Sequence, residues 1–264
     1  MSAERTTQRV GDVVVQTGDD HVATLTITRP PDNYFDHALI ASLADVYEQL
    51  DADASCRAIV LQSEGRHFCA GARLGAAAPT GVAAAPGRHL YDEAIRLFAA
   101  GKPVVAAVQG AAIGGGLGLA MSADFRIGTL DSRMSANFAR LGFHHGFGLT
   151  VTLPLVAGQQ RANELLFTGR RIAGDEAHAI GMLDRLVAPA DLDAAAHALA
   201  AEIAASAPLA VTSIRATMRR GLVEQIRVAT AHERSEQERL MHTADFAEGI
   251  AATAARRPPE FEGR

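Results

Sequence analysis

The chain has 264 residues, and 25 Lys and Arg against 30 Asp and Glu leave a formal net charge of −5 with histidines counted neutral. A net negative charge excludes a general binder of nucleic acids or other polyanions. The apolar share of 48% and the charged share of 21% exclude a disordered chain, and the length allows a large hydrophobic core. We therefore expect a compact globular protein.

The sequence shows no sign of secretion, membrane insertion or metal binding. Residues 1–20 are polar and lack the apolar core of a secretory leader. The uncharged stretch 103–123 has nearly the length of a membrane span, but glycines divide it into short pieces. Cys56 and Cys69 are interpreted as small buried hydrophobic residues, and the ten histidines lack the spacing of a metal site. We expect a cytoplasmic protein with no membrane association, metal or separate cofactor.

The N-terminal part predicts a hairpin followed by a helix and a strand. β-Branched residues in 13–16 and 22–28 flank a polar turn, as in a β-hairpin. Apolar residues at helical spacing then cover 39–50 behind Asp36, a candidate N-cap. Residues 57–62 predict the next buried strand.

The next part of the chain repeats this alternation of helix and strand. Its pattern predicts a helix over 90–98, a buried strand over 104–108, a helix that begins at the glycines, and a strand over 125–127. Strands that alternate with helices imply a parallel, layered α/β core. The Gly- and Ala-rich stretch 75–87 predicts a long loop that acts as a functional flap.

Strand signals vanish after about residue 190, where the apolar pattern becomes helical. We therefore expect an α/β core over 1–190 and a helical region over 191–264. The second region has so many apolar positions that a lone subunit would expose a large apolar patch. Burial of that patch in a symmetric oligomer is the expected solution.

Two glycine turns, each after a buried strand, carry the most informative pattern. In 104–120 the turn contains Gly110 and the Gly114-Gly-Gly triplet and precedes a helix, so free N–H groups and the helix dipole would face a negative oxygen. Its spacing does not fit a dinucleotide or phosphate loop, and glycines that only permit close helix packing are the alternative. A similar turn of small residues occupies 65–74. Two such turns can aim two N–H donors at one carbonyl oxygen, which is an oxyanion hole.

In order and spacing, these segments resemble the enoyl-CoA hydratase/isomerase family of the crotonase superfamily over nearly the whole chain. The matching positions are Thr26–Pro30 with Asn33, Arg57–Leu61, Phe68–Ala72, Lys102–Gly110, Gly114–Gly116, Ala123–Ile127, Glu164–Gly169, Glu176-Ala177 with Gly181, and Asp245, Glu248-Gly249, Arg257 and Phe261. The resemblance implies an α/β crotonase fold, a spiral of ββα units with a C-terminal helical trimerisation region. It also implies an acyl-CoA substrate, with coenzyme A as part of the substrate, and a homotrimer or a dimer of trimers.

The resemblance also implies the site residues. The oxyanion donors correspond to the backbone N–H groups of Ala72 and Gly115, which would stabilise a thioester enolate. The remaining substrate-binding positions correspond to Ala70, Leu74, Gly114, Phe138 and Leu141.

Several positions depart from the family pattern. The two glutamates with which hydratases of this family move protons correspond to Gly118 and Phe138, which can act neither as acid nor as base. The family's aromatic residue near the C-terminus, associated with the neighbouring subunit's CoA pocket, is replaced by Thr253. We therefore expect an acyl-CoA enzyme that is not a standard hydratase. A non-catalytic acyl-CoA binder is the alternative, as is a divergent hydrolase, decarboxylase or dehalogenase-like enzyme that uses histidine.

Histidines are the remaining candidates for acid–base chemistry. His144 and His145 correspond to a turn that borders the acyl pocket in the family, although a solvated or structural pair is equally open. His89 corresponds to an active-site histidine of 4-chlorobenzoyl-CoA dehalogenases, whose nucleophilic aspartate has no counterpart here. Asp124 is interpreted as a structural residue that opens a strand, and 232–234 as a solvated or intersubunit helix face.

Overall fold

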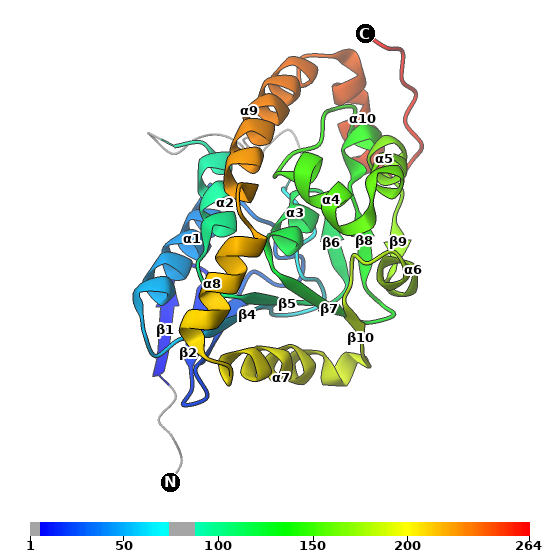
Figure 1. Ribbon diagram of the computed structural model, residues 1–264. Coiled ribbons are helices and arrows are strands. Elements are labelled where there is room, and N and C mark those ends of the chain that lie inside the picture. Colours follow the sequence, from blue (N-terminus) through cyan, green and yellow to red (C-terminus); the bar gives the residue numbers. More distant parts are fainter. Residues whose placement is uncertain (1–5, 74–87) are drawn as a thin grey trace.

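The computed structural model describes residues 6–73 and 88–264. The loop predicted over 75–87, and Leu74 before it, lie outside the described residues. Figure 1 shows two sheets at the centre, with helices α1, α2, α8 and α9 along one side and α7 beneath the larger sheet.

The strands of the described residues form two sheets. The larger has the order β1-β2-β3-β4-β5-β7-β10 and the smaller the order β6-β8-β9. The strands are β1 (Thr6–Val10), β2 (Val13–Thr17), β3 (Val22–Ile27), β4 (Ala58–Ser63), β5 (Val104–Val108), β6 (Ala111–Ile113), β7 (Phe125–Gly128), β8 (Arg133–Ser135), β9 (Ile172–Ala173) and β10 (Arg185–Leu186).

Strand direction in the larger sheet changes at β3. The strands β1, β2 and β3 pair antiparallel, which confirms the predicted hairpin, whereas β3, β4, β5, β7 and β10 pair parallel. The predicted strands over 57–62, 104–108 and 125–127 correspond to β4, β5 and β7. Isolated bridges join Phe35 to Ala72 and Cys69 to Ala112 beside the smaller sheet. Phe35 follows β3, Cys69 and Ala72 follow β4, and Ala112 follows β5. The two bridges therefore hold the segments after these three strands side by side.

Helices cover both sheets. They are α1 (His37–Ala52), α2 (Leu90–Ala99), α3 (Gly115–Ser122), α4 (Leu149–Ala157), α5 (Gln159–Thr168), α6 (Gly174–Ala179), α7 (Leu192–Ala204), α8 (Pro208–Met218), α9 (Leu222–Leu240) and α10 (Ala244–Ala255), with the 3₁₀ helices η1 (Asn137–Leu141) and η2 (Pro189–Asp191). The predicted cap at Asp36 is confirmed, because its side chain accepts a hydrogen bond from the Leu39 N–H at 2.9 Å.

The hydrophobic core has two parts, one on each face of the larger sheet. The larger part packs α1, α2, α3 and α4 against the sheets and includes both cysteines. Burial raises the pKa of the Cys56 thiol to about 11 and that of Cys69 to about 12, as expected for unreactive core residues. The smaller part packs Leu192, Ala196 and Leu199 of α7 against the opposite face. Helix α7 is therefore a layer of the core, whereas α8, which follows it, has no buried residue.

Length and apolar composition do not allow any single described helix to cross a membrane. The segments 189–204 and 208–218 pass that test only as a pair, and they are bent by 105° where they meet.

Candidate active site

The two glycine turns lie side by side between the sheets. The N–H of Cys69 donates to the Ala111 carbonyl at 2.9 Å, and the N–H of Ile113 donates to the Cys69 carbonyl at 3.1 Å. A Cβ on Gly116 would overlap the Cys69 carbonyl oxygen, so glycine is required for this close approach. The two turns, which lie far apart in the sequence, are thus held as one unit.

Each turn presents a backbone N–H at this junction. Gly114, with φ +57°, turns the chain into α3, so that Gly115 is the first residue of a helix whose N-terminus has no side-chain cap. In the other turn, Gly71 adopts φ +99° and its carbonyl accepts from the Phe35 N–H at 3.0 Å. Within the described chain, no acceptor is bonded to the N–H of Ala72 or to that of Gly115. As far as the described residues are concerned, both donors are available to a ligand.

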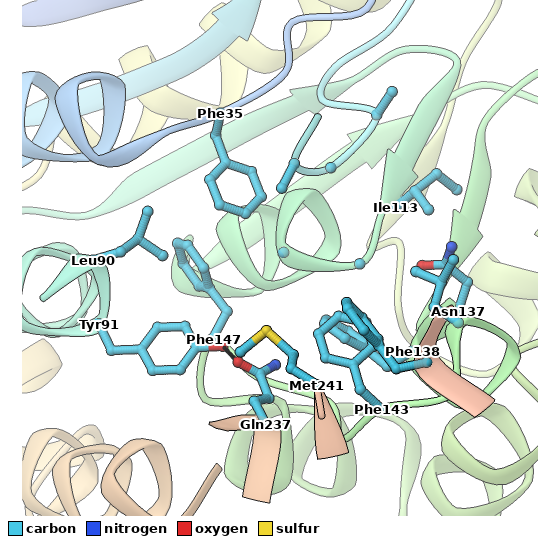
Figure 2. A pocket seen from close by; sticks show the side chains of 17 residues that line it. Phe35, Leu90, Tyr91, Ile113, Asn137, Phe138, Phe143, Phe147, Gln237 and Met241 are labelled. Carbon is cyan, nitrogen blue, oxygen red and sulfur yellow. Dashed lines mark hydrogen bonds between the residues drawn. The ribbon is translucent and has the colours of Figure 1, made fainter. Parts of the chain in front are cut away.

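Ala72 and Gly115 both line one pocket, which has about 700 Å³ of empty space including its mouth (Figure 2). The described residues that line it are Phe35, Ala70, Gly71, Ala72, Leu90, Tyr91, Ile113, Gly114, Gly115, Asn137, Phe138, Leu141, Phe143, Phe147, Gln237, Met241 and Phe246. Every substrate-binding residue expected from the sequence is among them except Leu74, which lies outside the described residues. The described lining contains no charged side chain and no imidazole, and six of its 17 residues are aromatic.

Phe147 fills the space beside Gly118. A Cβ on Gly118 would lie 2.6 Å from the Cβ of Phe147, which leaves no room for a side chain at position 118. Phe147 has φ +61° and packs edge-on against Phe35 and Phe98, with ring centroids 5.7 and 6.5 Å apart. Sequence reasoning missed this residue, although an aromatic side chain between Gly146 and Gly148 was the available signal.

The structure places His145 away from the described pocket wall. A hydrogen bond of 2.8 Å joins its Nε2 to the Oγ1 of Thr150, and its ring stacks on that of His144 with centroids 4.1 Å apart. Burial, with smaller contributions from His144 and His232, lowers the pKa of His145 to about 4. The imidazole is therefore neutral and weakly basic near pH 7.

His89 is also outside the described wall, and it caps helix α2. Its ring Nδ1 accepts a hydrogen bond from the Tyr91 backbone N–H at 3.1 Å. The backbone N–H of His89 donates to the Asp92 carboxylate at 2.9 Å, and the two bonds together form a capping box. Burial lowers the pKa of His89. The contribution of His89 to the pocket is indirect, because the helix that it caps brings Leu90 and Tyr91 to the wall.

The interpretation of 232–234 as a solvated or intersubunit face is wrong for Glu233. This side chain is fully buried within the subunit. Its carboxylate accepts hydrogen bonds from the N–H of Gly148 at 2.9 Å, and from the N–H and hydroxyl of Thr150 at 3.0 and 2.6 Å. Helix α9 thereby holds the N-terminus of α4 and the turn that carries Phe147.

Gln237, one turn further along α9, forms part of the wall itself. It accepts from the Tyr91 hydroxyl at 2.7 Å and donates to the His144 carbonyl at 2.9 Å (Figure 2). Burial raises the pKa of Tyr91, so the phenol stays protonated. Sequence reasoning missed both residues because their pairing spans 146 positions.

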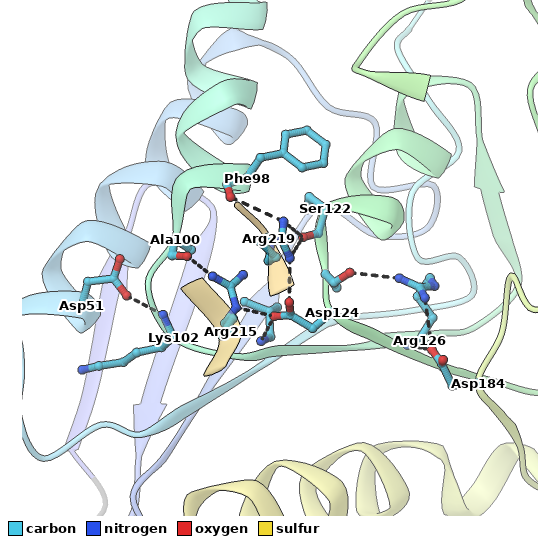
Figure 3. A network of polar contacts seen from close by, with 12 residues as sticks. Asp51, Phe98, Ala100, Lys102, Ser122, Asp124, Arg126, Asp184, Arg215 and Arg219 are labelled. Atoms are coloured by element: carbon cyan, nitrogen blue, oxygen red, sulfur yellow. Dashed lines mark hydrogen bonds and ion pairs between the residues drawn. The ribbon is translucent and has the colours of Figure 1, made fainter. Parts of the chain in front are cut away.

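Asp124 has the structural role that was predicted for it (Figure 3). Its carboxylate accepts from the Val104 N–H at 2.9 Å, from Arg215 at 2.9 Å and from Arg219 at 2.6 Å. These contacts join the start of β7 to β5 and α8 and lie away from the pocket. Elsewhere in the described residues, no group of three His, Cys, Asp or Glu side chains is arranged to hold a metal ion.

Known proteins resemble this chain over most of its length. The model of the enoyl-CoA hydratase/isomerase family matches residues 17–264. The carnitinyl-CoA dehydratase of Proteus mirabilis is 34% identical over 92% of this chain and 95% of that protein. The 1,2-epoxyphenylacetyl-CoA isomerase of Escherichia coli is 32% identical over the same shares of the two chains.

A solved structure shows the same architecture. The crystal structure of an enoyl-CoA hydratase/isomerase from Pseudoalteromonas atlantica T6c superposes with a TM-score of 0.86 at 28% identity, and the match covers 95% of this chain and all of that one. The expected α/β crotonase fold with C-terminal helices is thereby confirmed. The chain belongs to the enoyl-CoA hydratase/isomerase family, whose members act on acyl-CoA thioesters.

Proposed function

We propose that the pocket binds an acyl-CoA thioester with its carbonyl oxygen between the N–H groups of Ala72 and Gly115, and that these donors stabilise the enolate. The observation that carries this proposal is the presence of two available N–H donors in one apolar pocket. A donor aimed at a developing oxyanion contributes a factor of about 10²–10³ to the rate. The names of the two curated relatives, both of which specify a CoA thioester, support this substrate class.

The enzyme is not a standard hydratase. By the resemblance, the two family glutamates correspond to Gly118 and Phe138, and Phe147 fills the space beside Gly118. Loss of a general acid or base costs a factor of about 10²–10⁴ for each group. We therefore expect crotonyl-CoA hydration to be very slow, and ordinary hydratase turnover would contradict this part of the proposal.

A non-catalytic acyl-CoA binder is the second candidate. The observation in its favour is that Tyr91, held neutral by burial, is the only ionisable side chain on the described wall. The segment 74–87 contains no carboxylate or imidazole that could complete the site. Catalysis and binding alone therefore have to be separated by experiment.

Exchange at the acyl α-carbon separates the two candidates. The protein is incubated in D₂O with a panel of saturated and unsaturated acyl-CoA thioesters, and the mass of each acyl group is followed. Deuterium uptake or a new product supports an enzyme that forms an enolate, whereas binding without either supports the binder. The matching S-alkyl-CoA thioethers, which lack the carbonyl, are the control. Equal affinity for a thioester and its thioether would contradict the oxyanion hole.

We also propose that the protein forms a homotrimer or a dimer of trimers. Helix α8 has no buried residue in the single subunit, and its Leu209 and Met218 side chains are 84% and 80% exposed. An apolar helix face of this kind is stabilised by burial in a closed, symmetric interface. Light scattering after size-exclusion chromatography tests this, and a mass near the 27.7 kDa of one chain at micromolar concentration would contradict it.

A further inference from the structure

Asn137 lies beside the oxyanion turn, on a segment that is fixed to that turn. It is the first residue of η1, and only Ala136 separates it from β8. The Gly114 N–H donates to the Ser135 carbonyl at 2.8 Å, so the chain that enters η1 runs alongside the glycine triplet. On its other side, a Cβ on Gly169 would lie 3.2 Å from the Asn137 Cα. The backbone at Asn137 therefore has little freedom to move.

The side chain of Asn137 faces the pocket next to Gly114. Its Oδ1 lies 3.3 Å from the position that a Cβ on Gly114 would occupy, and its amide is at the edge of the pocket in Figure 2. Gly114 precedes Gly115, whose N–H is one of the two oxyanion donors. A thioester carbonyl bound there would place the first carbons of the acyl chain within reach of the Asn137 amide.

The amide of Asn137 has unused hydrogen-bonding capacity. No described residue donates to or accepts from it, whereas the other two polar side chains of the wall, Tyr91 and Gln237, bond to each other. An acyl chain that is wholly apolar would cover this amide without giving it a partner. Asn137 is half-buried, and an amide that a ligand buries without giving it a partner is costly, so the pocket favours a ligand that supplies one.

We propose that Asn137 is a specificity-determining residue that hydrogen-bonds a hydroxyl group on the acyl chain close to the thioester. A hydroxyl can donate to Oδ1 and accept from Nδ2, and it carries no charge, which fits the described wall, where no side chain is charged. The six aromatic side chains of the wall, Phe35, Tyr91, Phe138, Phe143, Phe147 and Phe246, surround the rest of the acyl group. This inference rests on the proposed function, because the thioester must bind at Ala72 and Gly115 for the hydroxyl to reach Asn137.

Titration calorimetry with a matched pair of ligands tests the inference. The probes are 3-phenylpropanoyl-CoA and both enantiomers of 3-hydroxy-3-phenylpropanoyl-CoA, which differ only in the hydroxyl. We expect one enantiomer to bind the wild-type protein about tenfold more tightly than the unsubstituted thioester. Asn137→Leu, which has a similar shape without the amide, should reduce this ratio to about one. Asn163→Leu, at an asparagine on α5 outside the described pocket wall, is the matched control and should retain the ratio.

Each other outcome overturns a defined part of the argument. A wild-type ratio near one, or a ratio that survives in Asn137→Leu, would overturn the role of Asn137 while leaving acyl-CoA binding in place. Failure of all three thioesters to bind would overturn the proposed function as well. If Asn137→Leu does not fold by circular dichroism, Asn137→Ala takes its place, and the same loss of the ratio is required.

Discussion

The substitution Glu233→Gln tests whether the buried carboxylate of α9 holds the turn that shapes the pocket. Both oxygen atoms of this carboxylate accept hydrogen bonds, Oε2 from Gly148 and Oε1 from Thr150. Glutamine has nearly the same shape but carries an NH₂ group at one end. If its oxygen keeps both bonds from Thr150, its NH₂ group must face the Gly148 N–H, which is also a donor.

The magnitude follows from these contacts. A buried N–H that loses its acceptor costs about 1–3 kcal/mol of folding free energy. The lost negative charge also stood at the N-terminus of α4, where it contributed roughly 0.5–1 kcal/mol through the helix dipole. We therefore expect Glu233→Gln to lower the free energy of unfolding by about 1.5–4 kcal/mol. Acyl-CoA affinity should fall with it, because Phe147 lies on the turn that Glu233 holds.

Urea unfolding followed by circular dichroism, at fixed protein concentration, provides the measurement. The matched control is Glu236→Gln. This glutamate lies in the next turn of α9, and its side chain pairs with Arg239 at the surface. The control should unfold close to the wild-type urea concentration, as is usual for surface ion pairs. A midpoint for Glu233→Gln that is no lower than that of the control would refute the reasoning.

Three further substitutions test other parts of the structure. Gly118→Ala should lower stability by about 1–3 kcal/mol, because the new methyl group meets Phe147; thermal unfolding at or above the wild-type temperature would contradict this. Asp124→Asn should cost roughly 3 kcal/mol, since two mostly buried arginines lose their carboxylate, and urea unfolding measures it. The His145 pKa of about 4 lies below its unfolded value of about 6.5. Only the unfolded state then binds a proton between these values, so stability should fall as pH drops from 6.5 to 4. His145→Gln should flatten this fall, and an unchanged slope would contradict it.

Features with a local physical cause were predictable from the sequence. The hairpin, the buried strands β4, β5 and β7, and the helices α1 and α2 each span enough residues for alternation or helical spacing to show. The cap at Asp36 was predictable because its partner is only three residues away. The strands β6 and β8 to β10 were missed because segments of two or three residues carry no measurable periodicity.

Features that depend on distant partners were not predictable. Glu233 stands in a charged run that is typical of a solvated face, and its partners on the 148–150 turn are more than 80 residues away. His145 and His89 are close in sequence to pocket residues, but their rings bond to Thr150 and to the α2 backbone. Proximity along the chain says nothing about the direction in which a side chain points.

The sequence by itself determined the two glycine turns and their place after buried strands, because glycine is required where backbones approach within a side chain's width. It also determined that positions 118 and 138 carry no acid or base. Only the tertiary structure decided that Phe147 fills the space beside Gly118 and that Asn137 lines the pocket. The reason is physical: backbone conformation is governed by neighbouring residues, whereas the environment of a side chain is set by whatever the whole fold packs against it.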